Sequence, residues 1–161
     1  MPYNKKLSIC QYLSPQISLY SLEFIKVLEY TQSMEMQLEV VTVPVSDVDK
    51  ALEFYADKLG FHVDGDWKMD GGVRYVQLTP VGSGCSIVIG NNITKSQPGS
   101  IDSLLLVVGN IQKVHDALVK KGVKTTDVEK MPWGAWHIYL SDPDGNKLTI
   151  QQKPPTQKES L

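Results

Sequence analysis

Two stretches of this chain follow the same plan at a constant spacing, and this internal duplication constrains the fold more than any other feature. Each stretch begins with a β-branched run, continues with a helical pattern that ends at a glycine, Gly60 or Gly122, and leads into a pair of strand-like runs. The matching positions lie 63 residues apart (108 − 45) and are Val45 and Val108, Val48 and Ile111, Lys50 and Lys113, and Gly82 and Gly145. The sequence therefore predicts two copies of a strand–helix–hairpin unit within one domain.

The clearest hairpin is the one that closes the second copy. Its turn, Asp142–Asn146, contains a proline that fixes φ and residues that tolerate the left-handed region. An aromatic and β-branched run, Trp136–Leu140, precedes the turn, and an alternating run, Lys147–Gln151, follows it. Strand periodicity places Leu148 and Ile150 on one face, towards a core, and Lys147, Thr149 and Gln151 on the other. The second face is expected to meet water or a ligand.

The remaining elements follow from periodicity and from capping residues. Helices are expected after Ser46 or Asp47 and after Asn110, because these side chains accept hydrogen bonds from the first turn of a helix. Strands are expected over 38–45, 74–79, 85–89 and 103–108, a polar turn-rich link over 64–72, and a linker between the copies over 91–100. Residues 1–34 are expected to form an N-terminal helical extension, residues 35–152 the domain, and residues 153–161 a mobile tail.

Composition argues against several classes of partner. The 161 residues have a formal net charge of −2, and Arg74 is the single arginine, so we expect neither a nucleic acid nor a membrane as partner. Cys10 and Cys85 have no metal-ligand spacing and form no disulfide framework. The first residues contain no apolar run long enough for a signal peptide, which predicts a cytoplasmic protein.

Several short motifs resemble those of a known superfamily. They are Val43–Asp49, Phe54-Tyr55, Leu59-Gly60-Phe61, Pro132-Trp133-Gly134 and Asp142–Asn146. Together, from about Leu38 to Gln152, they resemble the vicinal oxygen chelate superfamily, which includes glyoxalase I, extradiol dioxygenases, and the bleomycin and fosfomycin resistance proteins. The resemblance implies an α+β fold in which two βαβββ units form a curled sheet cleft with the helices outside. Because this fold hosts many reactions as well as simple binders, it does not fix the chemistry.

The resemblance also locates the positions that hold a metal ion in the metal-using members. In those proteins each unit gives ligands from its first and last strands. The matching positions here are Val40, Ser103, Thr149, and Ser86 or Ile87. None of these side chains is a His, Glu or Asp, which a divalent metal needs as donors. We therefore expect no metal and no other cofactor.

The residues expected to bind a ligand come partly from this matching and partly from the pattern. The open face of the sheets, away from the helices, is expected to hold Val40, Thr42, Ser103, Thr149 and Gln151. Trp133 and Trp136 are either walls of a ligand pocket or ordinary fillers of a corner between loop and strand. Arg74 is either a clamp for a ligand carboxylate or a surface residue in an ion pair.

Three functions remain open at this point. The first is a metal-free protein, similar to the bleomycin resistance branch, that sequesters or senses a small organic molecule. The resemblance implies a homodimer whose clefts form partly across the interface. The second is an enzyme, either lyase-like or dioxygenase-like with an altered metal site or a metal-independent isomerase, with His137, Arg74, Asp70 and Tyr75 as acid–base candidates. The third is an interaction module that uses residues 1–34 as its arm.

Overall fold

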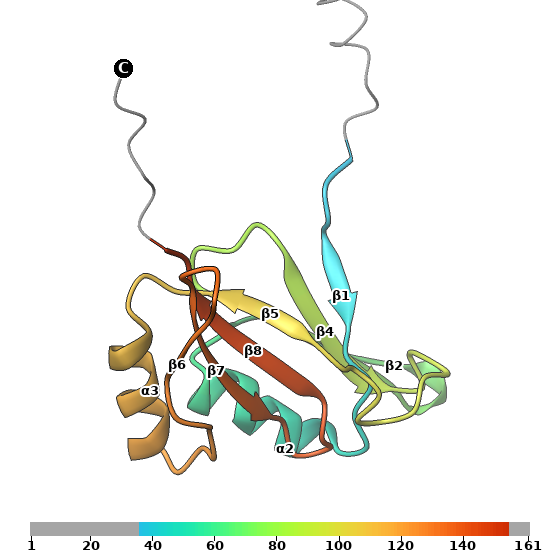
Figure 1. Ribbon diagram of the computed structural model, residues 1–161. Helices are drawn as coiled ribbons and strands as arrows, with labels where there is room; N and C mark the ends of the chain where they lie inside the picture. The colour runs from blue at the N-terminus through green and yellow to red at the C-terminus, as the bar shows by residue number, and fades with distance from the viewer. Residues whose placement is uncertain (1–35, 155–161) are drawn as a thin grey trace, which may run out of the picture. The chain divides into compact units, whose positions relative to one another are not determined.

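The computed structural model describes residues 36–154, and the expected extension over 1–34 and most of the expected tail lie outside the described residues. The fold is α+β with two modules, each containing one four-stranded mixed sheet (Figure 1). The first module contains β1 (Val40–Thr42), α2 (Val48–Leu52), a π-helix (Glu53–Lys58), β2 (His62–Met69), a 3₁₀ turn (Asp70–Gly72), β3 (Val73–Thr79) and β4 (Ser86–Asn91). The second contains β5 (Leu104–Val107), α3 (Ile111–Lys120), β6 (Glu129–Lys130), β7 (Trp136–Ser141) and β8 (Lys147–Gln152).

The strand order confirms the duplication that the 63-residue spacing predicts. The sheets run β1-β4-β3-β2 and β5-β8-β7-β6, so each strand has its counterpart at the same place in the other sheet. In both sheets the first strand pairs in parallel with the last strand, and the other pairs are antiparallel. Two copies of a βαβββ unit therefore form the described part of the chain.

One expectation about loops was wrong, and one short strand gave no signal in the sequence. Residues 64–72 were expected to be a turn-rich link, but most of them belong to β2, which pairs with β3 over its whole length. The loop over 124–135 contains the short strand β6. Both are edge strands whose side chains are mostly exposed, so they lack the apolar alternation that reveals a half-buried strand. Pairing with a neighbour outweighs their weak local signal.

Both helices begin at the residues that the sequence predicts. The Asp47 side chain accepts hydrogen bonds from the backbone N–H of Asp49 and Lys50, and the Asn110 side chain accepts one from Lys113 N–H. The first helix continues as a π-helix and ends at Gly60, whose φ of +79° is the left-handed conformation that suits glycine. These local signals fix where each helix starts against its sheet.

One hydrophobic core joins the two modules. The inward side chains of β7 and β8, Ile138, Leu140, Leu148 and Ile150, pack in the same cluster as residues of both helices and of β3 and β4. Burial of Leu148 and Ile150, with Lys147, Thr149 and Gln151 more exposed, confirms the predicted alternation of β8. Each sheet therefore has one face packed on this core and an opposite face, called the open face, that points away from the core.

A buried polar cluster fixes the Asp142–Asn146 turn of the second module against the first. Asn146 is 1% exposed, and its Nδ2 donates to the Pro44 carbonyl (2.9 Å) and to Asp142 Oδ2 (2.8 Å). Its Oδ1 accepts from the Ile101 N–H (3.1 Å). The hydroxyl of Tyr55 donates to Asp142 Oδ2 (3.0 Å), and burial, together with the nearby Asp142 carboxylate, raises the pKa of Tyr55 well above its usual value. Tyr55 therefore stays a neutral donor.

We expect the cluster to fail when the donor at Asn146 becomes an acceptor. Asn146→Asp keeps the shape of the side chain but replaces the Nδ2 donor with an oxygen. That oxygen then faces two acceptors, the Pro44 carbonyl and the Asp142 carboxylate. Urea denaturation should show the free energy of unfolding lowered by at least about 2 kcal/mol. The same substitution at the exposed cap, Asn110→Asp, should change it by less than about 0.5 kcal/mol, because Asp caps a helix as well as Asn. Equal effects of the two variants would contradict this account of the turn.

Candidate functional site

The open face of the second sheet presents two rows of side chains away from the helices. Because Ile138, Leu140, Leu148 and Ile150 point into the core, the residues that alternate with them point the other way. The register places Leu105, Thr149 and Tyr139 in one row across the strands, and Val107, Gln151 and His137 in the next. Leu105 and Val107 are about half exposed (52% and 54%), so this face offers apolar surface to a ligand or partner.

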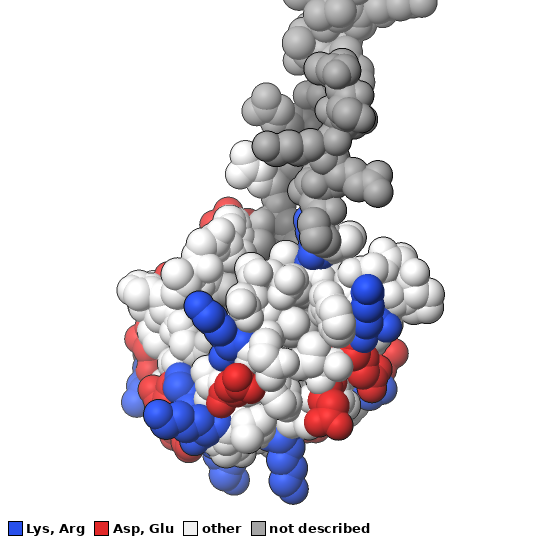
Figure 2. Space-filling view, turned by 60° about the vertical axis from the view of Figure 1, so that its left-hand side comes forward, with Lys and Arg blue, Asp and Glu red and all other residues white. Residues whose placement is uncertain are grey.

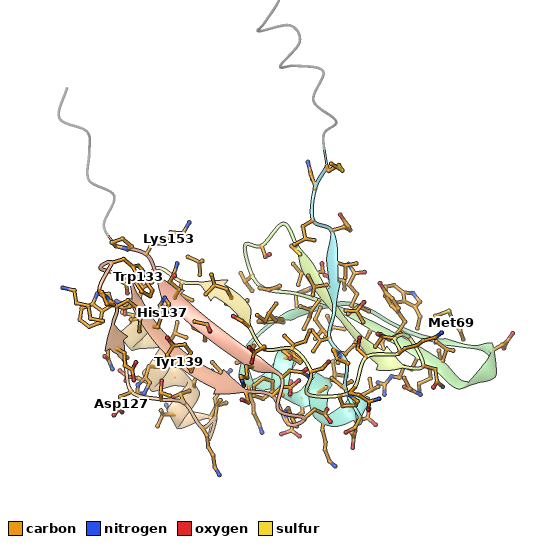
Figure 3. All side chains as sticks on the ribbon, turned by 45° about the vertical axis from the view of Figure 1, so that its right-hand side comes forward. Met69, Asp127, Trp133, His137, Tyr139 and Lys153 are labelled. Atoms are coloured by element: carbon orange, nitrogen blue, oxygen red, sulfur yellow. The ribbon has the colours of Figure 1, made fainter. Side chains whose placement is uncertain are left out.

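Three aromatic rings gather at the end of this face. The ring of His137 makes edge contacts with Trp133 and with Tyr139, each at 5.8 Å between centroids (Figure 3). Trp133 is 64% exposed, so most of its indole surface is available for stacking. Figure 3 also shows that Met69, at the end of β2, lies far from this group.

His137 organises the neighbouring polar groups. The ring is 8% exposed; Nδ1 lies 3.1 Å from the Tyr139 hydroxyl and Nε2 lies 2.9 Å from Gln151 Oε1. A neutral imidazole satisfies both contacts when Nε2–H donates to Gln151 and Nδ1 accepts from Tyr139. With both nitrogens hydrogen-bonded, His137 holds Tyr139 and Gln151 in place.

The open face of the first sheet differs, because its polar groups bind one another. The Thr79 hydroxyl contacts Asp64 Oδ2 (2.5 Å) and Ser86 Oγ (2.6 Å), and Gln77 Nε2 donates to Ser86 Oγ (3.2 Å). The hydrogen bond from Thr79 holds the pKa of Asp64 below its usual value. On the second sheet, by contrast, the hydroxyls of Ser103, Ser141 and Thr149 form no hydrogen bond with any residue of the described range. Ser103, Ser141 and Thr149 therefore keep hydrogen-bonding capacity that Thr79, Ser86 and Gln77 use among themselves.

The predicted ligand-binding residues other than Arg74 are distributed over three places. Ser103, Thr149, Gln151 and Trp133 come together on the side of the open face of the second sheet. Val40 and Thr42 lie on β1 of the first sheet, paired with Ser86 and Val88. Trp136 instead packs against the core on the helix side, with Lys130 Nζ 5.5 Å from its ring centroid.

Arg74 lies on the helix side of the first sheet. Its guanidinium contacts Asp66 through Nε (2.9 Å) and Nη2 (2.6 Å), and Asp49 of α2 through Nη1 (2.6 Å). The side chain is 17% exposed. The hydrogen bonds from Arg74 hold the pKa of Asp66 below its ordinary value of 3.8. These contacts favour a structural role over the carboxylate clamp that the sequence also allowed.

A cavity of about 840 Å³ lies beside the β7–β8 turn and is lined by second-module residues alone. Ser103 and Thr149 line it, together with residues that the sequence reasoning did not single out: Asp102, Lys124, Thr125, Thr126, Tyr139 and Ser141. Extending the strand alternation to β5 and β7 would have found Leu105, Val107 and Tyr139. The residues at 124–126 come from a loop and gave no signal.

The residues at the metal positions of the family do not fit a metal ion. Val40 has no donor atom, and the hydroxyls of Ser103 and Thr149 are weak neutral ligands. Within the described residues, no group of three or more His, Cys, Asp or Glu side chains is placed to hold a metal. No mechanistic step is therefore assigned to a metal.

Charges are mixed on the surface that Figure 2 presents. Basic and acidic side chains are interspersed around an uncharged area, in keeping with the formal net charge of −2. Over residues 36–154, none of the helices has the length and apolar character needed to cross a membrane. The cytoplasmic location stays a prediction.

Comparison with known proteins identifies the family. The model of the Glyoxalase/Bleomycin resistance protein/Dioxygenase superfamily matches residues 37–150. The chain belongs to this superfamily.

Among solved structures it is similar to TnmS3, an antibiotic binding protein from Streptomyces sp. CB03234. The identity is 30%, the TM-score is 0.68, and the match covers 75% of this chain and 98% of that one. A glyoxalase/bleomycin resistance protein from the same organism gives 32% identity and a TM-score of 0.64 over 72% and 100% of the two chains. The uncharacterized protein YurT of Bacillus subtilis (strain 168) is 31% identical over 73% of this chain and 100% of its own.

The ion pairs of Arg74 predict an acid-dependent contribution to stability. Because the folded pKa of Asp66 is lowered, the pair stabilises the protein fully above about pH 5, and this stabilisation is lost as pH falls below 3.8. Arg74→Met should therefore lower the free energy of unfolding at pH 7, with the difference from the wild type shrinking below pH 3.8. Urea denaturation across pH 2.5–7 measures this.

Lys68→Met is the matched control, because Lys68 faces Arg74 in the same hairpin and has no ion pair among the described side chains. Its difference from the wild type should be small and should vary less with pH. A difference for Arg74→Met that stays constant down to pH 2.5 would contradict the assignment.

Proposed function

We propose that this protein binds a small organic molecule on the open face of its second sheet, and that it sequesters or senses that molecule. The observation that carries the proposal is that one face combines apolar surface with positioned polar groups. The apolar surface comes from exposed Trp133 and from half-exposed Leu105 and Val107. The polar groups are the Tyr139 hydroxyl and the Gln151 amide, which His137 holds by hydrogen bonds. Apolar walls with a few placed hydrogen-bonding groups are typical of sites for organic ligands. The similarity to TnmS3, described as an antibiotic binding protein, supports the same class of function.

Binding without bond chemistry agrees with the positions of the candidate acid–base groups. His137 uses both ring nitrogens for Tyr139 and Gln151, and Arg74 is paired on the helix side. Tyr75 packs against Trp67 (5.8 Å between centroids), and Asp70 lies in the turn between β2 and β3. These groups do not converge on one point, which an acid–base mechanism requires.

The proposal includes a homodimer. Val40 and Thr42 lie on the first sheet, and the cavity that Ser103 and Thr149 line does not include them. Both sheets also expose apolar side chains, among them Trp67 and Met69 on the first and Leu105 and Val107 on the second. A second copy that placed its first sheet over this open face would complete the cleft and cover this surface.

Trp133 should carry much of the binding energy. In isothermal titration against a panel of flat aromatic compounds, Trp133→Ala should weaken the binding of those compounds that bind by about 2 kcal/mol, roughly 30-fold in affinity.

Thr149→Val should leave the fold intact and lower the binding free energy by about 0.5–1.5 kcal/mol if its hydroxyl bonds the ligand. The control is Val119→Ala, an exposed apolar residue of α3 outside both open faces, and it should bind like the wild type. No binding by the wild type across the panel at millimolar concentration would refute the proposed function.

Sedimentation equilibrium should show a dimer at the concentrations where ligand binds. The expected mass is about twice the 17.9 kDa of the chain. A monomer with full ligand affinity would refute the shared cleft and leave the second sheet as the whole site.

A further inference from the structure

The open face of the second sheet changes character along its strands. The row of Val107, Gln151 and His137 lies at the end where the exposed indole of Trp133 packs against the His137 ring, so this end offers aromatic and apolar surface around one amide. Lys147 lies four residues before Gln151, at the start of β8. It pairs with Ser141, and its amine contacts Asp102 (2.5 Å). At about 3.3 Å per residue, these two ends lie about 13 Å apart. One elongated ligand can therefore contact both.

The cavity beside the β7–β8 turn occupies the polar end. Its volume of about 840 Å³ is within the range of about 300–1,000 Å³ that small-molecule sites have. Six of its lining residues bear hydroxyl groups: Ser103, Thr125, Thr126, Tyr139, Ser141 and Thr149. Hydroxyls both donate and accept hydrogen bonds, so this lining suits a partner group that does the same.

The charges of the lining balance. Asp102 and Asp142 are opposed by Lys124 and Lys147. Lys147 is already paired with Asp102, and the Asp142 carboxylate accepts hydrogen bonds from Tyr55 and Asn146. An anionic or cationic group would meet a like charge in the lining as well as an opposite one. A neutral polar group avoids this conflict.

Several of the hydroxyls are free to bind. Ser103 and Ser141 are exposed and Thr149 is half-buried, and none of the three has a side-chain hydrogen bond to another described residue. Thr125 Oγ1 in the cavity wall is buried and is without a partner in the part of the chain that the structure describes. The corresponding hydroxyls of the first sheet, on Thr79 and Ser86, already bind each other. The polar end of the second sheet thus has hydrogen-bonding capacity that the fold does not use.

We infer that this cavity is a second compartment of the ligand site and that it takes a neutral, polyhydroxylated group, such as a sugar ring. That group is attached to the flat ligand that lies against Trp133. The inference rests on the proposed function and narrows its ligand class to aromatic glycosides and compounds of similar build. Tyr139 joins the two compartments, because it contacts His137 at one side and lines the cavity at the other.

Matched pairs of compounds test this with the full-length chain. Each pair consists of a flat aromatic glucoside and the methyl ether of the same aromatic ring, built on coumarin, flavone and acridone. In isothermal titration the best-bound glucoside should bind about tenfold more tightly than its methyl ether. The double variant Ser103→Ala/Ser141→Ala should remove that difference by weakening the binding of the glucoside about tenfold. Trp133→Ala should weaken both compounds by the same factor.

The control double variant is Ser96→Ala/Ser100→Ala in the linker between the modules, which should keep the tenfold difference. If a methyl ether binds and its glucoside binds no better, the inference is overturned while the proposed function stands. The same holds if Ser103→Ala/Ser141→Ala weakens both compounds alike. If no compound of either kind binds, the proposed function is refuted and the inference with it.

Discussion

The two modules depend on the buried side chain of Asn146. It lies in the turn between β7 and β8, yet it bonds the Pro44 carbonyl, in the segment between β1 and α2. Tyr55 bonds Asp142 in the same cluster, and Ser46 at the start of α2 donates to Asp144. Buried polar groups are costly when unpaired, so each of these contacts permits essentially one placement of the turn. A single turn therefore fixes the second module against the first.

That turn also shapes the candidate site. Asp142 faces the Asn146 cluster and at the same time lines the cavity beside the hairpin. Because the turn is held, β7 and β8 present Tyr139 and Thr149 side by side on the open face. The contacts that stabilise the fold and the surface proposed to bind a ligand thus share one piece of backbone. The proposed ligand site lies on paired strands, which favours binding without rearrangement.

The duplicated modules have diverged in how they use polar groups. On the first sheet, Thr79, Ser86 and Gln77 form a closed set of hydrogen bonds. On the second, hydroxyls such as Thr149 stay free, and a histidine, His137, holds the neighbouring groups in place. The same backbone plan therefore carries a closed set of hydrogen bonds around Ser86 on one face, and on the other face hydroxyls without a partner among the described residues. This difference, and not the fold itself, is the reason for proposing the ligand site on the second sheet.

The sequence by itself determined what depends on near neighbours along the chain. The caps Asp47 and Asn110, the hairpin turn, the alternation of β8 and the 63-residue duplication are all local or periodic signals. Only the tertiary structure decided that β2 is a strand, that Arg74 is paired with Asp49 and Asp66, and that Trp133 and Trp136 face opposite sides. It also decided which hydroxyls remain free and where the loop at 124–126 closes a cavity. These outcomes depend on contacts between residues distant in the chain, and a pattern of residue types does not specify which partners they meet.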